Sequence, residues 1–140
     1  KKYTGERTGV VVMGLDYAGV FVENTKDGLL LSQSVCDEAD RGSLEKTNAS
    51  VSLEGNTVYL KSTFSTMDRK NAGNEGGYDL VVMCKFSYSM DGMTYRSLGI
   101  PFRVKEGRWI GAKTGLFCTR PSIQTNDGGW TDVDWFRIGK

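Results

Sequence analysis

Histidine is absent from this chain of 140 residues. Its absence excludes zinc sites built on imidazole, Ser-His and Cys-His nucleophilic systems, and any histidine acting as a general acid or base. Cysteine is scarce: Cys36, Cys84 and Cys118 are an odd number with no CxxC spacing, so at most one disulfide can form. We therefore expect buried free thiols in apolar strands rather than a disulfide scaffold.

Long apolar runs and an excess of one charge are also missing. No apolar run, Val10–Met13 included, approaches the about 20 residues that cross a bilayer, so no membrane segment is expected. Lys and Arg number 18 against 17 Asp and Glu, and the basic residues are scattered. Phosphate binding needs a concentrated basic face, so nucleic acid is not expected as a partner. No signal peptide is visible, and we expect residues 1–8 to lead in from an upstream segment.

Glycine, in contrast, is abundant, with 18 residues beside only 2 prolines, which indicates many tight turns. Between the turns lie roughly ten short segments rich in β-branched and aromatic residues. Hairpin turns are expected at Asp27-Gly28, Glu54-Gly55-Asn56, Asp91-Gly92 and Glu106-Gly107. The one charged stretch compatible with a helix, 37–46, is short and broken by Gly42, so we expect a loop with at most one helical turn. The pattern predicts an all-β antiparallel sandwich, one domain over residues 1–140.

The core of this predicted sandwich draws on alternate apolar residues of each strand. Extended segments are expected at 9–13, 29–36, 78–90 and 108–119, with 131–138 as the closing strand. The inward residues are expected to be Val11, Met13, Val20, Val22, Leu31, Val58, Leu60, Val82, Cys84, Phe86, Leu116, Phe136 and Ile138.

Three ordered motifs resemble those of a known family. They are Phe86-x-Tyr88-Ser89-x-Asp91-Gly92, then Gly107-x-Trp109-Ile110-Gly111-Ala112-Lys113-x-Gly115-Leu116-Phe117, then Asp132-x-Asp134-Trp135-Phe136. With the early segment Gly9–Ala18, they resemble the C-terminal β-sandwich domain of family 43 glycoside hydrolases, the β-xylosidases and α-L-arabinofuranosidases. The resemblance covers residues 9–138 and implies a concanavalin A-like jelly roll of two antiparallel sheets.

The resemblance also implies a function. Domains of this kind are classed as carbohydrate-binding modules of family 91, with xylan as their ligand class, and they accompany a catalytic propeller that this chain lacks. The implied function is non-catalytic binding of xylan or a related hemicellulose polysaccharide, without a cofactor, beside an attached glycoside hydrolase catalytic domain. The alternative is a structural accessory domain that packs on the propeller and shapes its pocket without binding sugar alone. A bacterial source is implied, and we expect a secreted or periplasmic location.

Aromatic rings are the first candidates for contact with a sugar, because the C–H faces of a pyranose pack well on them. Trp109 lies between Arg108 and Ile110, and Trp130 lies in a glycine-containing loop. Trp135 lies in the expected closing strand and faces away from an inward Phe136. Trp109 has a second interpretation, as a rim or core residue that caps the sandwich, and both interpretations stay open.

Polar candidates lie near these rings. Asp16 and Tyr17, adjacent in an expected turn, offer a hydroxyl acceptor and a stacking ring; the alternative is a tyrosine that pins the turn. Lys113 would lie on the same strand face as Trp109 and bind sugar hydroxyls, or else be a solvated surface lysine. Gln33 and Arg41 complete the candidate set as lesser polar contacts.

The acidic residues suggest two other functions, glycoside hydrolysis and calcium binding. The stretch Asp37-Glu38-x-Asp40 resembles part of the Glu-x-Asp-x-x-Glu strand of jelly-roll glucanases, in which two carboxyl groups about 5 Å apart perform retaining hydrolysis. The final position here is Ser43 and the stretch is polar, so we expect no hydrolysis by this chain. The same stretch, or Asp132 with Asp134, offers oxygen ligands to a structural calcium ion, although the spacing does not require one.

Overall fold

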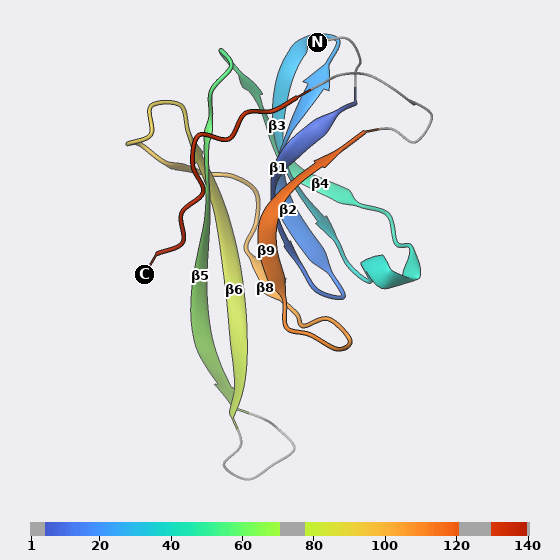
Figure 1. Ribbon diagram of the computed structural model, residues 1–140. Coiled ribbons are helices and arrows are strands. Elements are labelled where there is room, and N and C mark those ends of the chain that lie inside the picture. Colours follow the sequence, from blue (N-terminus) through green and yellow to red (C-terminus); the bar gives the residue numbers. More distant parts are fainter. Residues whose placement is uncertain (1–4, 71–77, 121–129, 140) are drawn as a thin grey trace.

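Two antiparallel β-sheets make up the protein (Figure 1). The computed structural model describes residues 5–70, 78–120 and 130–139, and the predicted all-β sandwich is confirmed in them. The charged stretch 37–46 is a loop with one helical turn, as predicted: a 3-10 helix, η1, spans Ala39–Arg41. Among the described residues, no helix has the length and apolar character needed to span a membrane.

The larger sheet has five strands in the order β4-β3-β2-β1-β9. Its strands are β1 (Arg7–Met13), β2 (Tyr17–Thr25), β3 (Gly28–Cys36), β4 (Lys46–Leu53) and β9 (Lys113–Thr119). The first and last strands of the chain pair with each other, with Val10 opposite Leu116. One edge of this sheet is therefore β9, and the other is β4.

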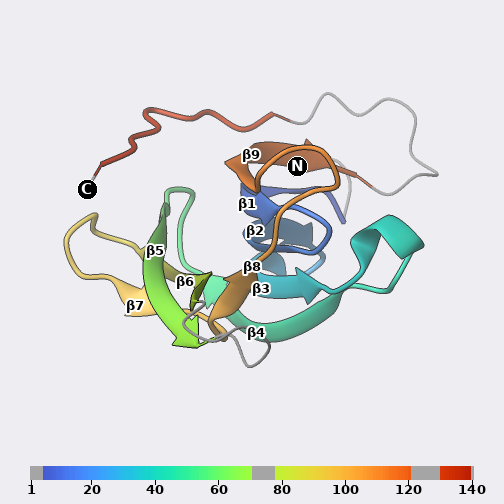
Figure 2. The same cartoon turned by 90° about the horizontal axis from the view of Figure 1, so that it is seen from below.

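The smaller sheet is built around β6. Its strands are β5 (Tyr59–Lys70), β6 (Tyr78–Ser89), β7 (Arg96–Ser97) and β8 (Phe102–Val104). β5 pairs along one edge of β6, and the short β7 and β8 both pair along the other. β5 is thus the outer strand of this sheet, and Figure 2 shows it on the same side of the molecule as the C-terminal segment.

The hydrophobic core lies between the sheets. Its buried cluster consists of Val12, Ala18, Val20, Leu31, Cys84, Phe86, Tyr88, Leu98 and Phe102. Burial of Val20, Leu31, Cys84 and Phe86 confirms those predictions, and Val22, Val58 and Leu60 pack against the cluster. Burying each large apolar side chain stabilises the fold by roughly 1.5–3 kcal/mol relative to leaving it exposed.

The inward face of β1 was predicted wrongly. Val10 and Val12 are the buried residues, whereas Met13 is 47% exposed and Val11 is only partly buried. Pairing with β2 sets Val12 opposite Ala18 and so points it into the core. Because side chains alternate along a strand, an error of one residue moves every side chain to the opposite face.

Two of the expected hairpin turns are confirmed. β2 and β3 pair through Asp27-Gly28, where Gly28 has φ +122°. β6 and β7 pair across Asp91-Gly92, and the Asp91 carboxylate accepts hydrogen bonds from the backbone N–H groups of Met93 and Thr94, both at 2.8 Å. An aspartate that holds the backbone just after it favours a turn at that point.

The hairpin expected at Glu54-Gly55-Asn56 is wrong, because the strands on either side lie in different sheets. β4 is an edge of the five-stranded sheet and β5 an edge of the four-stranded one. The predicted reversal at Glu106-Gly107 likewise joins β8 to β9, again in different sheets. A turn signal marks a change of direction, but the partner of each strand depends on the core that both sheets share.

The expected closing strand over 131–138 is also wrong. Residues 130–139, the C-terminal tail, have no strand assigned and run from near β9 toward β5 (Figures 1 and 2). Phe136 and Ile138, predicted to face inward, are 47% and 84% exposed, and Leu116 on β9 is 49% exposed. Polar and apolar residues alternate over 131–138 as they would in a strand. Such alternation produces a strand only where a neighbouring strand supplies hydrogen bonds.

Candidate functional site

Trp109 is the most exposed of the predicted site residues, at 94%. It lies in the loop 105–112, which precedes β9, and not on a strand. Lys113 is exposed at the start of β9, so the expectation that it shares a strand face with Trp109 is wrong. The loop is held by its neighbours: the Arg108 guanidinium donates to the Asp40 carboxylate at 2.9 Å, and Gly107 N–H donates to the Ile110 carbonyl at 2.8 Å.

Asp16 is buried, with 2% of its surface exposed. Its carboxylate forms an ion pair with Lys105 and accepts a hydrogen bond from the Glu38 backbone N–H at 2.7 Å. Burial raises the pKa of Asp16, but the bonds from Lys105 and Glu38 outweigh burial and leave the pKa below its usual value. Asp16 therefore ties the β1–β2 connection to loop 37–46 and to the segment after β8, and its oxygens face protein groups.

Tyr17 begins β2, and its ring is half-buried. Its hydroxyl donates to Glu45 Oε2 at 2.7 Å, and the same carboxylate is paired with the Arg7 guanidinium. Burial and the bond to Glu45 both raise the pKa of Tyr17. Arg7 also lies over the Phe21 ring, 4.8 Å from its centroid, so this network covers one face of the five-stranded sheet.

Gln33 and Arg41 differ in burial and in bonding partners. Gln33 is fully buried, and its Oε1 accepts hydrogen bonds from Asn48 Nδ2 at 2.9 Å and Ile100 N–H at 3.4 Å. Arg41 is exposed in η1 and pairs with Glu38 at 3.1 Å. The structure gives Gln33 a role in the core and Arg41 a contact within its own helical turn.

The two remaining tryptophans belong to the C-terminal tail. Trp130 is 82% exposed and Trp135 is 46% exposed. The Trp135 ring lies 6.2 Å from the Tyr59 ring in a tilted arrangement, and the Arg137 guanidinium lies 4.8 Å from the Trp135 centroid on the tail itself. These contacts attach the tail to β5 through aromatic and cation–π packing.

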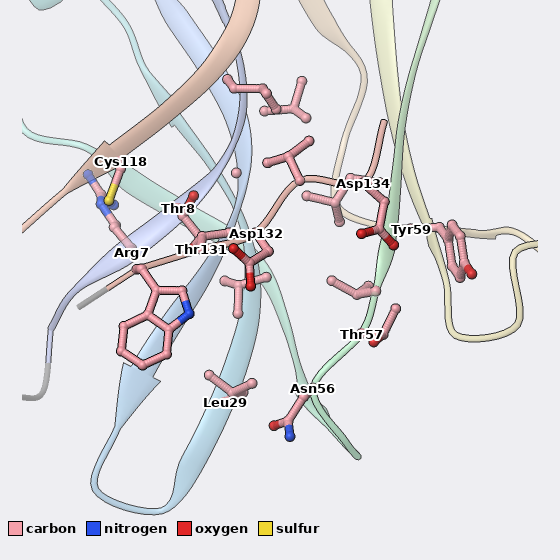
Figure 3. A pocket seen from close by; sticks show the side chains of 18 of the residues that line it. Arg7, Thr8, Leu29, Asn56, Thr57, Tyr59, Cys118, Thr131, Asp132 and Asp134 are labelled. Atoms are coloured by element: carbon pink, nitrogen blue, oxygen red, sulfur yellow. The ribbon is translucent and has the colours of Figure 1, made fainter. Parts of the chain in front are cut away.

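Beneath the tail lies a cleft between the two sheets, with a volume of about 1300 Å³. We call it the interlayer cleft. Figure 3 shows Arg7, Thr8 and Cys118 on one side and Asn56, Thr57 and Tyr59 on the other, with Thr131, Asp132 and Asp134 of the tail between them. Of the predicted residues, Trp130 and Trp135 line the cleft, whereas Trp109, Asp16, Tyr17, Lys113, Gln33 and Arg41 do not.

The family of the chain follows from comparison with known proteins. Residues 1–139 match the family described as the beta xylosidase C-terminal concanavalin A-like domain. The chain belongs to this family. A curated relative, a beta-xylosidase from Formosa agariphila (strain DSM 15362 / KCTC 12365 / LMG 23005 / KMM 3901 / M-2Alg 35-1), is 37% identical over 51 residues, which are 36% of this chain and 8% of that protein. No solved structure matches the chain.

This β-xylosidase-type domain has further cleft residues that the sequence did not single out as site candidates. Asn56 and Thr57 line the cleft from the β4–β5 connection, and Tyr59 lines it from the start of β5. Asn24 lines it from the end of β2. The asparagine in Glu54-Gly55-Asn56 was recognised only as a turn signal. Its position beside the tail depends on β4 and β5 lying in different sheets, which no local pattern shows.

Metal binding was a second expectation for the acidic residues of this domain. Within residues 5–70, 78–120 and 130–139, no group of three or more Cys, Asp or Glu side chains is arranged to hold a metal ion. In the acidic stretch, Glu38 pairs with Arg41 and Asp40 with Arg108. The calcium prediction gains no support from these residues.

Proposed function

We propose that this domain is a non-catalytic carbohydrate-binding module that recognises xylan or a related hemicellulose and is attached to a glycoside hydrolase catalytic domain. The observation that carries the proposal is the match of nearly the whole chain to the C-terminal domain of beta-xylosidases, combined with aromatic rings left in water. Trp130 and Trp135, which line the interlayer cleft, are 82% and 46% exposed. An exposed indole loses the hydrophobic stabilisation that burial would supply, so such rings are typical of binding surfaces.

The arrangement of the acidic side chains supports a role without catalysis. Hydrolysis of a glycoside requires a protonated acid and a second, ionised carboxylate on opposite sides of the bond. Glu38 and Asp40 are bound to Arg41 and Arg108, so the carboxylates of this acidic stretch contact protein groups and do not face each other as an acid and base pair.

Binding assays on the isolated domain test this function. Affinity electrophoresis and calorimetry against xylan, arabinoxylan and xylo-oligosaccharides should give weak binding, with a Kd of about 10–1000 µM, because stacking and a few hydrogen bonds supply the affinity. An incubation with β-glucan and xylan should release no reducing sugar. Absence of binding to every β-glycan would rule out the module, and release of sugar would rule out the non-catalytic role.

A second candidate function is a structural domain that packs on the attached catalytic domain. One observation favours it: Trp109 and Ile110 are consecutive apolar residues, 94% and 56% exposed, on a loop that ion pairs hold in place. Such a fixed apolar projection suits burial against a protein surface. Trp109→Ala in the full-length enzyme separates the two functions, because a docking residue changes the stability of the enzyme while sugar binding by the isolated domain is unchanged.

A further inference from the structure

We propose that the interlayer cleft is the glycan site of this domain and that it takes an uncharged segment of several linked sugars. This inference rests on the proposed carbohydrate-binding function and adds the location and the chemical class of the ligand. It includes the predicted candidates Trp130 and Trp135 in the site and leaves Trp109 outside it.

The cleft exists because the two sheets separate on one side. The buried core cluster joins the strands around β2, β3, β6 and β8, while β9 and β5 are outer strands with the tail between them. Leu116 is on the inward-facing side of β9, opposite Val10, yet remains 49% exposed. Apolar residues of both sheets form the floor of the cleft, and Leu116 is the exposed one among them; the floor comprises Val10, Val22, Leu29, Val58, Leu60 and Leu116.

The rim of the cleft is polar. Its donors and acceptors come from four parts of the chain: Thr8, Asn24, Asn56, Thr57, Asp132 and Asp134. Figure 3 shows the carboxylates of the tail opposite the amide and hydroxyl of the β4–β5 connection. An apolar ligand would leave the side chains of Asn56, Thr57, Asp132 and Asp134 without partners at a cost of about 1–3 kcal/mol each, whereas a sugar offers both hydroxyl groups for the rim and C–H faces for the floor.

Charge around the cleft favours a neutral ligand. Three acidic and three basic residues are among those that line it: Glu6, Asp132, Asp134, Arg7, Arg120 and Arg137. The formal charges cancel, so a polymer with a carboxylate on every sugar would gain no net attraction. Backbones of unsubstituted xylan type, which carry hydroxyl groups alone, fit this balance.

The size and walls of the cleft favour an oligomer. Its volume of about 1300 Å³ exceeds the roughly 300–1,000 Å³ typical of sites for single small ligands. Tyr59 and Trp135 pack together at one part of the lining and Trp130 lies at another. Aromatic rings at separate positions can each stack on a different sugar of one chain.

The test is calorimetry with xylohexaose on four forms of the domain: wild type, Leu116→Trp, Leu80→Trp and Trp109→Ala. Leu116→Trp places a large ring in the cleft at an exposed position, so it should fold and weaken binding at least about tenfold, since one lost contact of 1.4 kcal/mol is tenfold in affinity. Leu80→Trp is the matched control, because Leu80 is 65% exposed on β6 and does not line the cleft. It and Trp109→Ala should bind like the wild type, and circular dichroism should show that every form is folded.

Substitution of a hydrogen-bonding residue of the rim tests the same site with a smaller expected loss of affinity. Asn56→Ala should weaken xylohexaose binding by roughly threefold to tenfold, the usual effect of one lost hydrogen bond. In NMR spectra of the wild type, xylohexaose should shift the backbone amide signals of Leu29, Val58 and Leu116. Oligogalacturonate, the charged probe, should shift none of them, and binding of both probes with equal affinity would overturn the choice of a neutral ligand.

Failure of this inference is distinct from failure of the proposed function. If the wild type binds xylohexaose and Leu116→Trp binds equally well, the cleft is not the site, although the domain still binds sugar. If only Trp109→Ala loses binding, the site is the loop 105–112. If the wild type binds no xylo-oligosaccharide, the proposed function itself is overturned and the cleft assignment with it.

Discussion

Two regions carry exposed tryptophan, and their surroundings differ. Around Trp109, the polar side chains are already paired within the protein, Arg108 with Asp40 and Lys105 with Asp16. Trp130 lines the interlayer cleft, together with the side chains of Asn56, Asp132 and Asp134 (Figure 3). An exposed aromatic ring alone indicates a surface suited to apolar contacts. Recognition of a sugar also requires hydrogen-bonding side chains that are not already bonded to other protein groups.

The largest expected difference between the cleft and the core is in the reactivity of their cysteine thiols. Cys118, predicted to be buried, is exposed and lines the cleft, while Cys36 and Cys84 are buried. Burial also raises the pKa of Cys84 to about 12, which suppresses its reactive thiolate. A maleimide reagent should therefore modify one cysteine of the native domain, with the other two reacting only after unfolding.

Mass spectrometry of the intact protein counts the adducts, and peptide mapping locates them. A saturating xylo-oligosaccharide should slow modification of Cys118, because the ligand and the thiol share the cleft. Rapid labelling of Cys84 in the native protein would contradict the described core, and Cys118→Ser is the control for the single fast adduct.

The second prediction compares the stability effects of two leucines, Leu31 and Leu116, that were both predicted to face the core. Leu31→Ala should lower the free energy of unfolding by about 2–5 kcal/mol, because Leu31 is fully buried in the core cluster. Leu116→Ala should lower it by less than about 1 kcal/mol, because Leu116 is 49% exposed at the cleft. Urea denaturation of both variants measures the difference, and equal losses would mean that the cleft is closed in solution.

The third prediction concerns the ion pair between Asp16 and Lys105, which holds the loop 105–112 in place. Asp16→Asn should destabilise the domain by about 1–3 kcal/mol near neutral pH, because it removes the charge that binds Lys105 and Glu38 N–H. The folded-state pKa of Asp16 lies below its unfolded value, so its stabilisation is complete above the unfolded pKa and is lost as the pH falls through the folded pKa.

The difference between wild type and Asp16→Asn should therefore shrink in acid. Urea unfolding at pH 7 and at pH values below about 4 measures it, since the usual aspartate pKa is about 3.9. Asp91 and Glu45 also have lowered pKa values, so the comparison with the variant is needed to isolate Asp16. A difference that grows as the pH falls would contradict the assigned ion pair.

The smallest effect belongs to Trp109 itself. Trp109→Ala should change the free energy of unfolding of the isolated domain by no more than about 0.5 kcal/mol, because the ring is 94% exposed. Thermal unfolding monitored by circular dichroism checks this, with Phe86→Ala as a core control. A loss comparable to that of the core variant would show that Trp109 caps the sandwich, the second interpretation that the sequence left open.

The sequence predicted the features that depend on neighbouring residues. Turns at Asp27-Gly28 and Asp91-Gly92, and the single helical turn in 37–46, follow from local chemistry and were found as expected. The order of the family motifs led to the correct family. What failed depends on distant partners: the inward face of β1 follows from its register with β2, and the tail has no partner strand.

The candidate site was harder to predict for the same reason. Asp16 and Gln33 are polar residues of the type that contacts sugars, but whether a polar side chain faces solvent or a protein partner is decided by packing. Asn56 and Tyr59 come to the cleft only because β4 and β5 belong to different sheets. Trp130 was chosen because loop aromatics are often exposed, and Trp135 because it would face outward from the predicted closing strand, which the structure does not form.

The buried Gln33 has a consequence for how the two layers are aligned. A shift in the β3–β4 register between Gln33 and Ser34 accompanies its bond to Asn48, and its second bond reaches Ile100, in the connection between β7 and β8. Apolar contacts between sheets have little directional preference, so they allow one sheet to slide over the other. The bonds of Gln33 have fixed directions and lengths, and they select one lateral position of the small sheet, which in turn sets how wide the opposite side of the sandwich stands open.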